Sequence, residues 1–159
     1  MKITIISVGK IKEKFYRDAI DEYAKRLSKY CKFEIIEVAD EKTPDKCSET
    51  EEQLILSKEA EKILKYVRQD MFVYALAIKG KKLDSIAFAN EINQLGLTGK
   101  SSVAFVIGGS LGLHSSVLNR ADRQLSFSDM TFPHQLMRVI LSEQIYRCFR
   151  IIAKEPYHK

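Results

Sequence analysis

Two stretches in the second half of the chain carry residue types that could bind a ligand. The first is the glycine-rich turn Gly108–Gly112, which follows the apolar run Val103–Ile107. A Gly-Gly-x-x-Gly turn after a strand lets the backbone approach a ligand closely. The turn lacks the Gly-x-Gly spacing of dinucleotide sites and the Gly-Lys-Ser/Thr ending of phosphate loops. From the residues alone, a tight turn that needs positive φ and a ligand site are equally good interpretations.

The second stretch, Leu125–Leu136, combines several hydroxyls with a proline that can start a helix. Pro133 suits the first helical turn, and Thr131 precedes it as a candidate cap. Free amides and side-chain oxygens in such a loop can recognise a nucleoside. A capped helix start without any ligand is the alternative, and the residues favour it when they are taken alone.

The final helix combines basic, aromatic and apolar residues. Arg147 and Arg150 are one turn apart, and Arg147 with Tyr146 could contact a phosphate and a base. A solvated basic face is the alternative interpretation. The apolar positions cover more than one narrow stripe, which suits packing on the chain's own domain and on a second subunit. These positions are Leu136, Val139, Ile140, Ile145, Phe149 and Ile152.

None of the three histidines, His114, His134 and His158, has neighbours in the sequence that indicate catalysis. The terminal pair Tyr157-His158 would ordinarily be frayed. No Ser-His-Asp order, paired-carboxylate motif or metal-ligand spacing is present, so hydrolysis and metal chemistry are poor interpretations and we expect no metal site.

Composition permits a polyanionic partner without requiring one. The net charge is +5 and the sequence pI is about 9.0. Basic residues gather in Lys10–Lys32 and His134–Lys159, whereas acids dominate Glu37–Glu61, so the two ends could form a basic surface. No apolar run approaches the roughly 20 residues of a membrane span, and the N-terminal run is too short for a signal peptide. The cysteines form an odd, widely spaced set, which predicts a cytoplasmic protein without disulfides.

The elements that must position these residues alternate between strands and helices. Apolar runs predict strands at Lys2–Val8, Phe33–Val38, Phe72–Ile78, Val103–Ile107 and Gln124–Ser128. Helical spacing covers Phe15–Tyr30, Glu49–Val67, Leu83–Leu95 and a segment from Pro133 to about Lys154. We expect Asp40–Ser48 to be a loop, Lys79–Lys82 to stop the third strand, and Gly96 to end the third helix. This pattern predicts an α/β fold with a mostly parallel sheet, helices on both faces, and a single domain over residues 1–159.

Taken together, the motifs resemble the ribosomal RNA large subunit methyltransferase H family. The likeness runs from one end of the chain to the other, and its most specific part is the Thr-x-Pro-His-Gln-Leu block joined to the Tyr-His tail. Leu111 and Cys148 depart from the family pattern, and we expect neither position to take part in the chemistry. The matching segments are Ser7–Lys10, Phe105–Leu113, Leu125–Arg138, Glu143–Arg147 and Pro156–Lys159.

The resemblance implies a C-terminal trefoil knot of the SPOUT type, a homodimer, and S-adenosylmethionine held by the loops of the knot. By motif position, the residues expected to line the cofactor pocket are Leu76, Gly108, Phe127, Ser128, Asp129, Met130, Thr131 and Phe132. Three strand-end loops could enclose adenine with backbone amides and apolar side chains.

The implied substrate is a pseudouridine in the helix 69 stem-loop of 23S rRNA on the assembled ribosome, with no DNA or membrane partner. Methylation at N3 needs alignment with the methyl donor, an accessible base, and an acceptor for the N3 proton. We expect the tail, Tyr157 and His158, to reach the partner subunit's pocket and help hold or deprotonate the base. Arg138 is the next candidate for a base or phosphate contact, and His134 is less favoured.

Two other functions compete with this interpretation. A knotted methyltransferase could act on tRNA or on another rRNA site, because the surface contacts that select RNA are not evident in the sequence. A ribosome- or RNA-binding module without catalysis would need only the basic ends.

Overall fold

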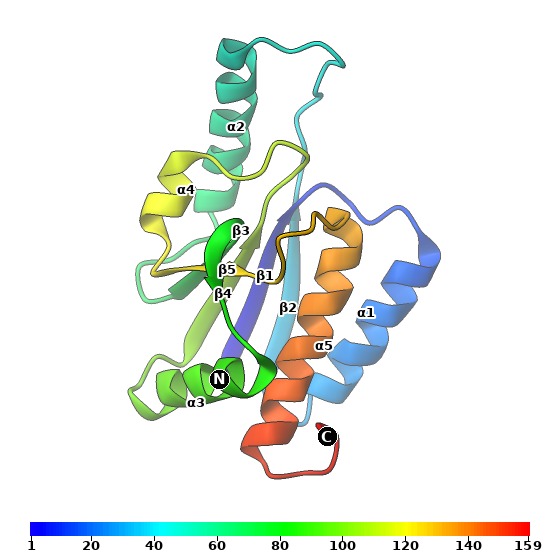
Figure 1. Cartoon of the computed structure of the whole chain (residues 1–159), viewed down its shortest axis with the longest axis vertical. Helices are drawn as coiled ribbons and strands as arrows, with labels where there is room; N and C mark the ends of the chain where they lie inside the picture. Colours follow the sequence, from blue (N-terminus) through cyan, green and yellow to red (C-terminus); the bar gives the residue numbers. More distant parts are fainter.

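The computed structural model describes residues 1–159 and arranges them around one five-stranded sheet (Figure 1). The strand order is β2-β1-β4-β3-β5, and every pair of neighbouring strands is parallel. This confirms the predicted parallel α/β architecture. The strands are β1 (Lys2–Val8), β2 (Lys32–Val38), β3 (Phe72–Lys82), β4 (Ser102–Ile107) and β5 (Arg123–Ser126).

Helices cover both faces of the sheet, because alternate side chains of the buried strands point to opposite sides. Ile3 and Ile5 of β1 belong to the apolar core under α1, α3 and α5, whereas Ile6 and Val8 belong to the core under α2 and α4. In Figure 1, α1 and α5 lie side by side, and α2 and α4 lie together on the other side of the strands. The helices are α1 (Lys14–Leu27), α2 (Glu49–Leu64), α3 (Ser85–Leu97), α4 (Ser115–Arg120) and α5 (His134–Ile152).

Three aromatic rings lock the centre of the sheet to α3. Tyr74 of β3 and Phe105 of β4 stack with their centroids 4.9 Å apart, and Phe88 of α3 meets the Phe105 ring edge-on at 6.0 Å. Fully burying such a ring stabilises the fold by roughly 1.5–3 kcal/mol. This cluster fixes β3 against β4 and so sets where their carboxyl ends open.

The predicted stop at Lys79–Lys82 is wrong, because β3 continues to Lys82. Its pairing with β5 shifts register between Leu76 and Lys81, both of which oppose Leu125. The four residues between them therefore form a bulge, and the strand resumes beyond it. The segment is polar and contains a glycine, which is typical of a turn. Its last residues form a strand because they pair with β5.

The ends of two helices also differ from expectation. The helix α3 runs from Ser85 to Leu97, so Gly96 lies inside it, and Gly99, with φ 81°, follows its end. The helix α5 begins at His134 after Pro133, which is its N-cap, and no side chain caps it. Thr131 is therefore not the cap. No helix is long and apolar enough to cross a membrane.

The helix α4 was not predicted, because six residues are too few for a periodic pattern. His114 is its N-cap, and the imidazole Nδ1 accepts a hydrogen bond from the Ser116 amide at 3.2 Å. This capping role accounts for His114.

Candidate functional site

The carboxyl ends of β3, β4 and β5 open into one cleft, which we call the strand-end cleft. Its volume is about 350 Å³. Ligands of open α/β sheets bind at this edge, beyond the carboxyl ends of the strands. Its lining residues are Leu76, Ala77, Ile78, Ile107, Gly108, Gly109, Ser110, Leu111, Gly112, Leu125, Ser126, Phe127, Ser128, Met130, Thr131, Phe132, His134 and Met137.

The glycine turn forms one wall, and Gly108 is required there for space. A Cβ at Gly108 would lie 2.3 Å from the carbonyl oxygen of Gly112. Gly112 has φ 86°, and its amide donates to the carbonyl of Gly109 at 3.1 Å. The turn therefore folds back on itself tightly, so that its glycine backbone lines the cleft together with Ser110 and Leu111.

The β3 bulge, Ala77–Gly80, forms a second wall. A Cβ at Gly80 would lie 2.7 Å from the carbonyl carbon of Gln124 in β5, so only glycine lets the two strands pass this closely. Ile78 lines the cleft although its side chain is half exposed. The bulge thus presents an apolar side chain at the mouth of the cleft.

The loop between β5 and α5 forms the third wall. The Ser128 hydroxyl accepts a hydrogen bond from the Met130 amide at 3.0 Å, and the Ser126 hydroxyl donates to the Ser128 carbonyl at 3.2 Å. These bonds hold the loop in a tight turn that leads into α5. The first amides of α5 have no acceptor within the helix and can serve a ligand.

Arg138 is anchored beside this region but is not exposed in it. Its side chain is 0% exposed. One guanidinium nitrogen donates to the carbonyls of Val8 and Gly9, both at 2.8 Å, and the other pairs with Glu37 at 2.9 Å. Burial lowers the pKa of Arg138, and the Glu37 carboxylate opposes this effect. In this conformation the guanidinium joins the start of α5 to the ends of β1 and β2 and offers no free surface to a phosphate.

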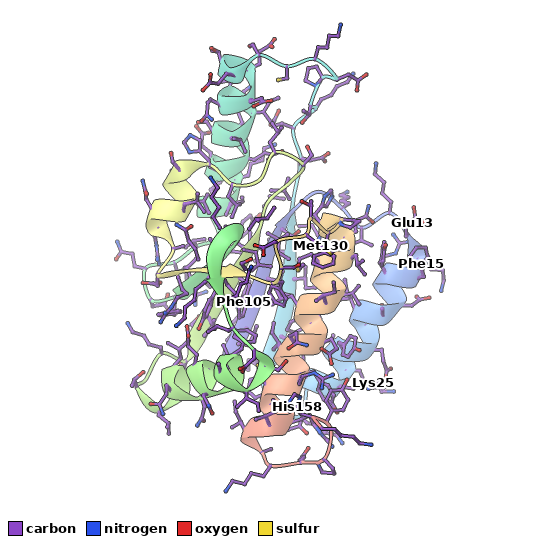
Figure 2. The ribbon with its side chains drawn as sticks, viewed as in Figure 1. Glu13, Phe15, Lys25, Phe105, Met130 and His158 are labelled. Carbon is purple, nitrogen blue, oxygen red and sulfur yellow. The ribbon has the colours of Figure 1, made fainter.

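The tail is packed at the other end of α5, as Figure 2 shows by the positions of Met130 and His158. The Tyr157 hydroxyl donates to Glu143 at 3.1 Å, and its ring lies edge-on to Tyr146 at 5.0 Å and under the Arg147 guanidinium at 4.7 Å. Burial, with the nearby Glu143 charge, raises the pKa of Tyr157 to about 12. The Tyr157 phenol is therefore a hydrogen-bond donor at neutral pH, not a base.

His158 faces a second hollow, of about 530 Å³, and not the strand-end cleft of its own chain. Its Nδ1 lies 3.3 Å from a guanidinium nitrogen of Arg147. The hollow lies between the start of α3, the end of β5 and α5, and it shares Leu125, Ser126 and Phe127 with the strand-end cleft. The end of β5 and Phe127 thus lie between the two spaces.

The family model described as "Predicted SPOUT methyltransferase" matches residues 1–158. The chain belongs to the SPOUT methyltransferase family. Proteins named "Ribosomal RNA large subunit methyltransferase H" match it over the full length of both chains. Those from Clostridium botulinum, Bifidobacterium adolescentis and Clostridium beijerinckii are 63%, 62% and 60% identical over 159 residues. The resemblance to this methyltransferase family is confirmed.

A solved structure shares the fold at much lower sequence identity. "The structure of a probable methylase family protein from Haemophilus influenzae Rd KW20" superposes with a TM-score of 0.50 at 16% identity. The match covers 96% of this chain and 66% of that chain. At this identity the likeness concerns the fold alone.

The SPOUT methyltransferase chain brings together the three segments that the resemblance assigned to its cofactor. Seven of the eight predicted pocket residues line the strand-end cleft. The exception is Asp129, whose carboxylate points outward to pair with Lys82. The structure places these seven residues around one cleft, whereas cofactor binding stays a prediction. Tyr157 and His158 lie elsewhere in the chain, and so their role also stays a prediction.

Two parts of the SPOUT methyltransferase cleft escaped the sequence analysis. The β3 bulge was taken for a strand end, and only Gly80 hinted at its close approach to β5. His134 was ranked below Arg138, because the sequence could not show that the imidazole lines the cleft while the guanidinium is buried. No group of three or more His, Cys, Asp or Glu side chains is placed to hold a metal ion.

Proposed function

We propose that this chain transfers a methyl group from S-adenosylmethionine to N3 of a pseudouridine in 23S rRNA, in the helix 69 stem-loop of the assembled ribosome. The observation that carries the proposal is the strand-end cleft, where three segments far apart in the sequence meet in a chain of the SPOUT methyltransferase family. The full-length relatives named for the ribosomal large subunit support this RNA as the substrate.

The cleft suits S-adenosylmethionine in size and chemistry. Its volume of about 350 Å³ falls within the range of roughly 300–1,000 Å³ of small-molecule sites. Leu76, Phe127 and Phe132 offer apolar surface for adenine, and the glycine turn offers backbone groups. No carboxylate lines the cleft, and the start of α5 favours a negative group such as the amino acid carboxylate of the cofactor. The bound cofactor would supply an activated methyl group on its sulfonium.

We also propose that the trefoil knot implied by the resemblance is formed by the cleft-lining half of the chain. The strands concerned, β3, β4 and β5, are neighbours in the sheet although they are not in sequence order. A knot through these strand ends would hold three cleft walls with few alternative conformations.

The active unit proposed is a homodimer in which the tail of one chain serves the cleft of the other. Support comes from α5, which carries the cleft at its first residues and the tail beyond its last. The second hollow, which Ile140 and His158 help to line, offers a partner chain a partly apolar surface on which to pack. Within such a dimer Tyr157 would hold the target base through its protonated hydroxyl.

RNA would approach over the loop between β1 and α1, beside the cleft. Lys10 and Lys12 of the loop and Lys14 at the start of α1 are exposed, and the Lys12 amide donates to the Gln135 side chain at 2.9 Å. That bond fixes the basic loop to the start of α5. Binding through such lysines releases counterions, so affinity for the ribosome should fall as salt rises. The reaction is proposed for the cytoplasm, in keeping with three free cysteines.

Parallel methyl-transfer assays test the proposal. The protein is incubated with labelled S-adenosylmethionine and, separately, with ribosomes, free 23S rRNA and tRNA, using ribosomes from a strain that lacks this gene. We expect label in 23S rRNA of the ribosomes, located at N3 of a pseudouridine by nuclease digestion and mass spectrometry. Label only in tRNA would contradict the substrate, and calorimetry without heat on addition of S-adenosylmethionine would favour a binding module.

A further inference from the structure

The strand-end cleft contains a single ionisable side chain among its lining residues, which is His134. The other polar side chains that line it are serine and threonine hydroxyls, which are too weakly basic to take a proton at neutral pH. An imide nitrogen such as N3 must lose its proton before its electron pair can attack a methyl group. A group in the cleft that can accept this proton therefore has to be identified.

His134 stands where three elements converge. Its Nε2 is 3.7 Å from the point that a Cβ of Gly9 would occupy, and that point is 3.9 Å from Cβ of Asp40 and 4.0 Å from a guanidinium nitrogen of Arg138. Gly9 has φ 82° and ends β1 without a side chain. The imidazole therefore lies close to the backbone just after β1 while it borders the cleft.

The surroundings of His134 favour its neutral imidazole. Burial is the main cause that lowers its pKa, and Arg138 and Lys12 lower it further against the opposing effect of Asp40. Arg138 cannot turn away from the ring, because two backbone carbonyls and Glu37 hold its guanidinium. A fixed buried cation beside a half-buried imidazole favours the unprotonated form, which is the form that accepts a proton.

We propose that His134 is the catalytic base that removes the N3 proton of the target nucleobase. The inference rests on the proposed function and deepens it. The N3–H bond breaks and its proton passes to the free ring nitrogen of His134. The electron pair left on N3 forms the new bond to the methyl carbon, and the sulfur of the donor keeps the pair of the broken C–S bond. The imidazolium then returns its proton to water.

This assignment divides the chemistry between two chains of the dimer. The tail holds the base through the Tyr157 hydroxyl, which keeps its proton, and the cleft supplies the acceptor. Arg138 is then a positioning residue, since it affects the reaction only through its charge and packing beside the His134 imidazole.

The test compares His134→Gln with His114→Gln, a control that removes an imidazole outside the cleft. We expect His134→Gln to lower kcat at neutral pH by roughly 100-fold or more, while the Kd for S-adenosylmethionine by calorimetry changes by less than about 3-fold. The variant should regain rate as the pH rises toward the ionisation of the imide, because the substrate then needs no base. In wild-type protein, NMR titration should place His134 below the ordinary pKa range.

Three outcomes decide the matter. A His134→Gln variant with kcat close to that of the wild type would overturn the assignment. So would a loss of activity that does not recover at alkaline pH, because that pattern marks a structural role. If wild-type protein binds S-adenosylmethionine but methylates no RNA, the proposed function itself fails, and this result is visible before any variant is made.

Discussion

The two ends of α5 are built by different physical means. At the first turns, Arg138 is fully buried and bound to backbone carbonyls of β1, more than a hundred residues away in the chain. At the far end, the tail is held by ion pairs and aromatic rings near the surface, among them Tyr157 on Arg147. The first end is rigid because its bonds are buried and non-local, whereas the second can exchange its contacts with solvent or with another chain.

The length of α5 explains why this difference matters. Its 19 residues span about 28 Å, so the two ends cannot act on one methyl group within one chain. A rigid end suits a cleft that must align a methyl donor. A detachable end suits a segment that completes a neighbour's site. The comparison therefore favours a site shared between two chains.

The largest effect is expected from removing the anchor at the rigid end. Arg138→Met leaves Glu37 and two carbonyls without their partner, which should lower the free energy of unfolding by about 3 kcal/mol. Urea denaturation measures this loss. The control is Arg26→Met, which breaks an exposed helical pair with Glu22 and should cost less than about 1 kcal/mol. Equal losses in the two variants would show that the start of α5 is not specially anchored.

Deleting Tyr157–Lys159 tests the detachable end. Methyl transfer should fall by roughly 100-fold, because the target base loses its alignment. The affinity for S-adenosylmethionine should change far less, since every residue that lines the cleft is kept in the shortened chain. Calorimetry and steady-state kinetics on the same preparation separate these two effects. Undiminished methylation by the shortened chain would reject a role for the tail.

Gly108→Ala tests the cleft alone. The new Cβ would lie 2.3 Å from the Gly112 carbonyl oxygen, so the turn must open to make room for it. Such overpacking costs about 1–3 kcal/mol. We expect the Kd for S-adenosylmethionine to rise roughly 5- to 150-fold by calorimetry. Gly99→Ala is the matched control, because Gly99 has positive φ but no neighbour near its Cβ position and lies outside the cleft. An unchanged Kd in Gly108→Ala would remove the turn from the site.

The smallest effect is expected at Asp129. Its carboxylate pairs with Lys82 in solvent and does not line the cleft. Asp129→Asn should therefore cost less than about 1 kcal/mol of stability. It should leave the affinity for S-adenosylmethionine unchanged, as thermal unfolding with and without the ligand can show. A marked loss of affinity would mean that the loop turns Asp129 inward on binding.

Much of the fold could be predicted from the sequence, because buried parallel strands form continuous apolar runs. Lys2–Val8 and Val103–Ile107 were recognised in this way. The segment around Gly80 could not be, since its lysines and glycine are typical of a turn and only the position of β5 makes it a strand. Pairing between strands distant in the sequence decides such cases.

The site was predictable where motifs mark it and unpredictable where three-dimensional contacts decide it. The turn Gly108–Gly112 and the stretch Leu125–Leu136 were singled out as separate candidates, and the fold brings residues of both into one cleft. The sequence could not show that His134 lines the cleft while Arg138 is buried outside it. Arg138 is buried because Val8, Gly9 and Glu37 bind its guanidinium. These residues are distant from α5 in the sequence, and no local pattern indicates that they pack against it.

Complementation between two impaired chains, assayed at a concentration of S-adenosylmethionine that does not saturate Gly108→Ala, tests the shared site most directly. Gly108→Ala, which keeps its tail, is mixed and co-refolded with the chain that lacks Tyr157–Lys159, which keeps its cleft, and light scattering verifies that both form dimers. We expect the mixture to regain methyl transfer to ribosomes well above either variant alone, because each mixed dimer joins one intact cleft to one intact tail. If mixed dimers form and activity stays at the level of the separate variants, the cleft and the tail do not serve one site across two chains.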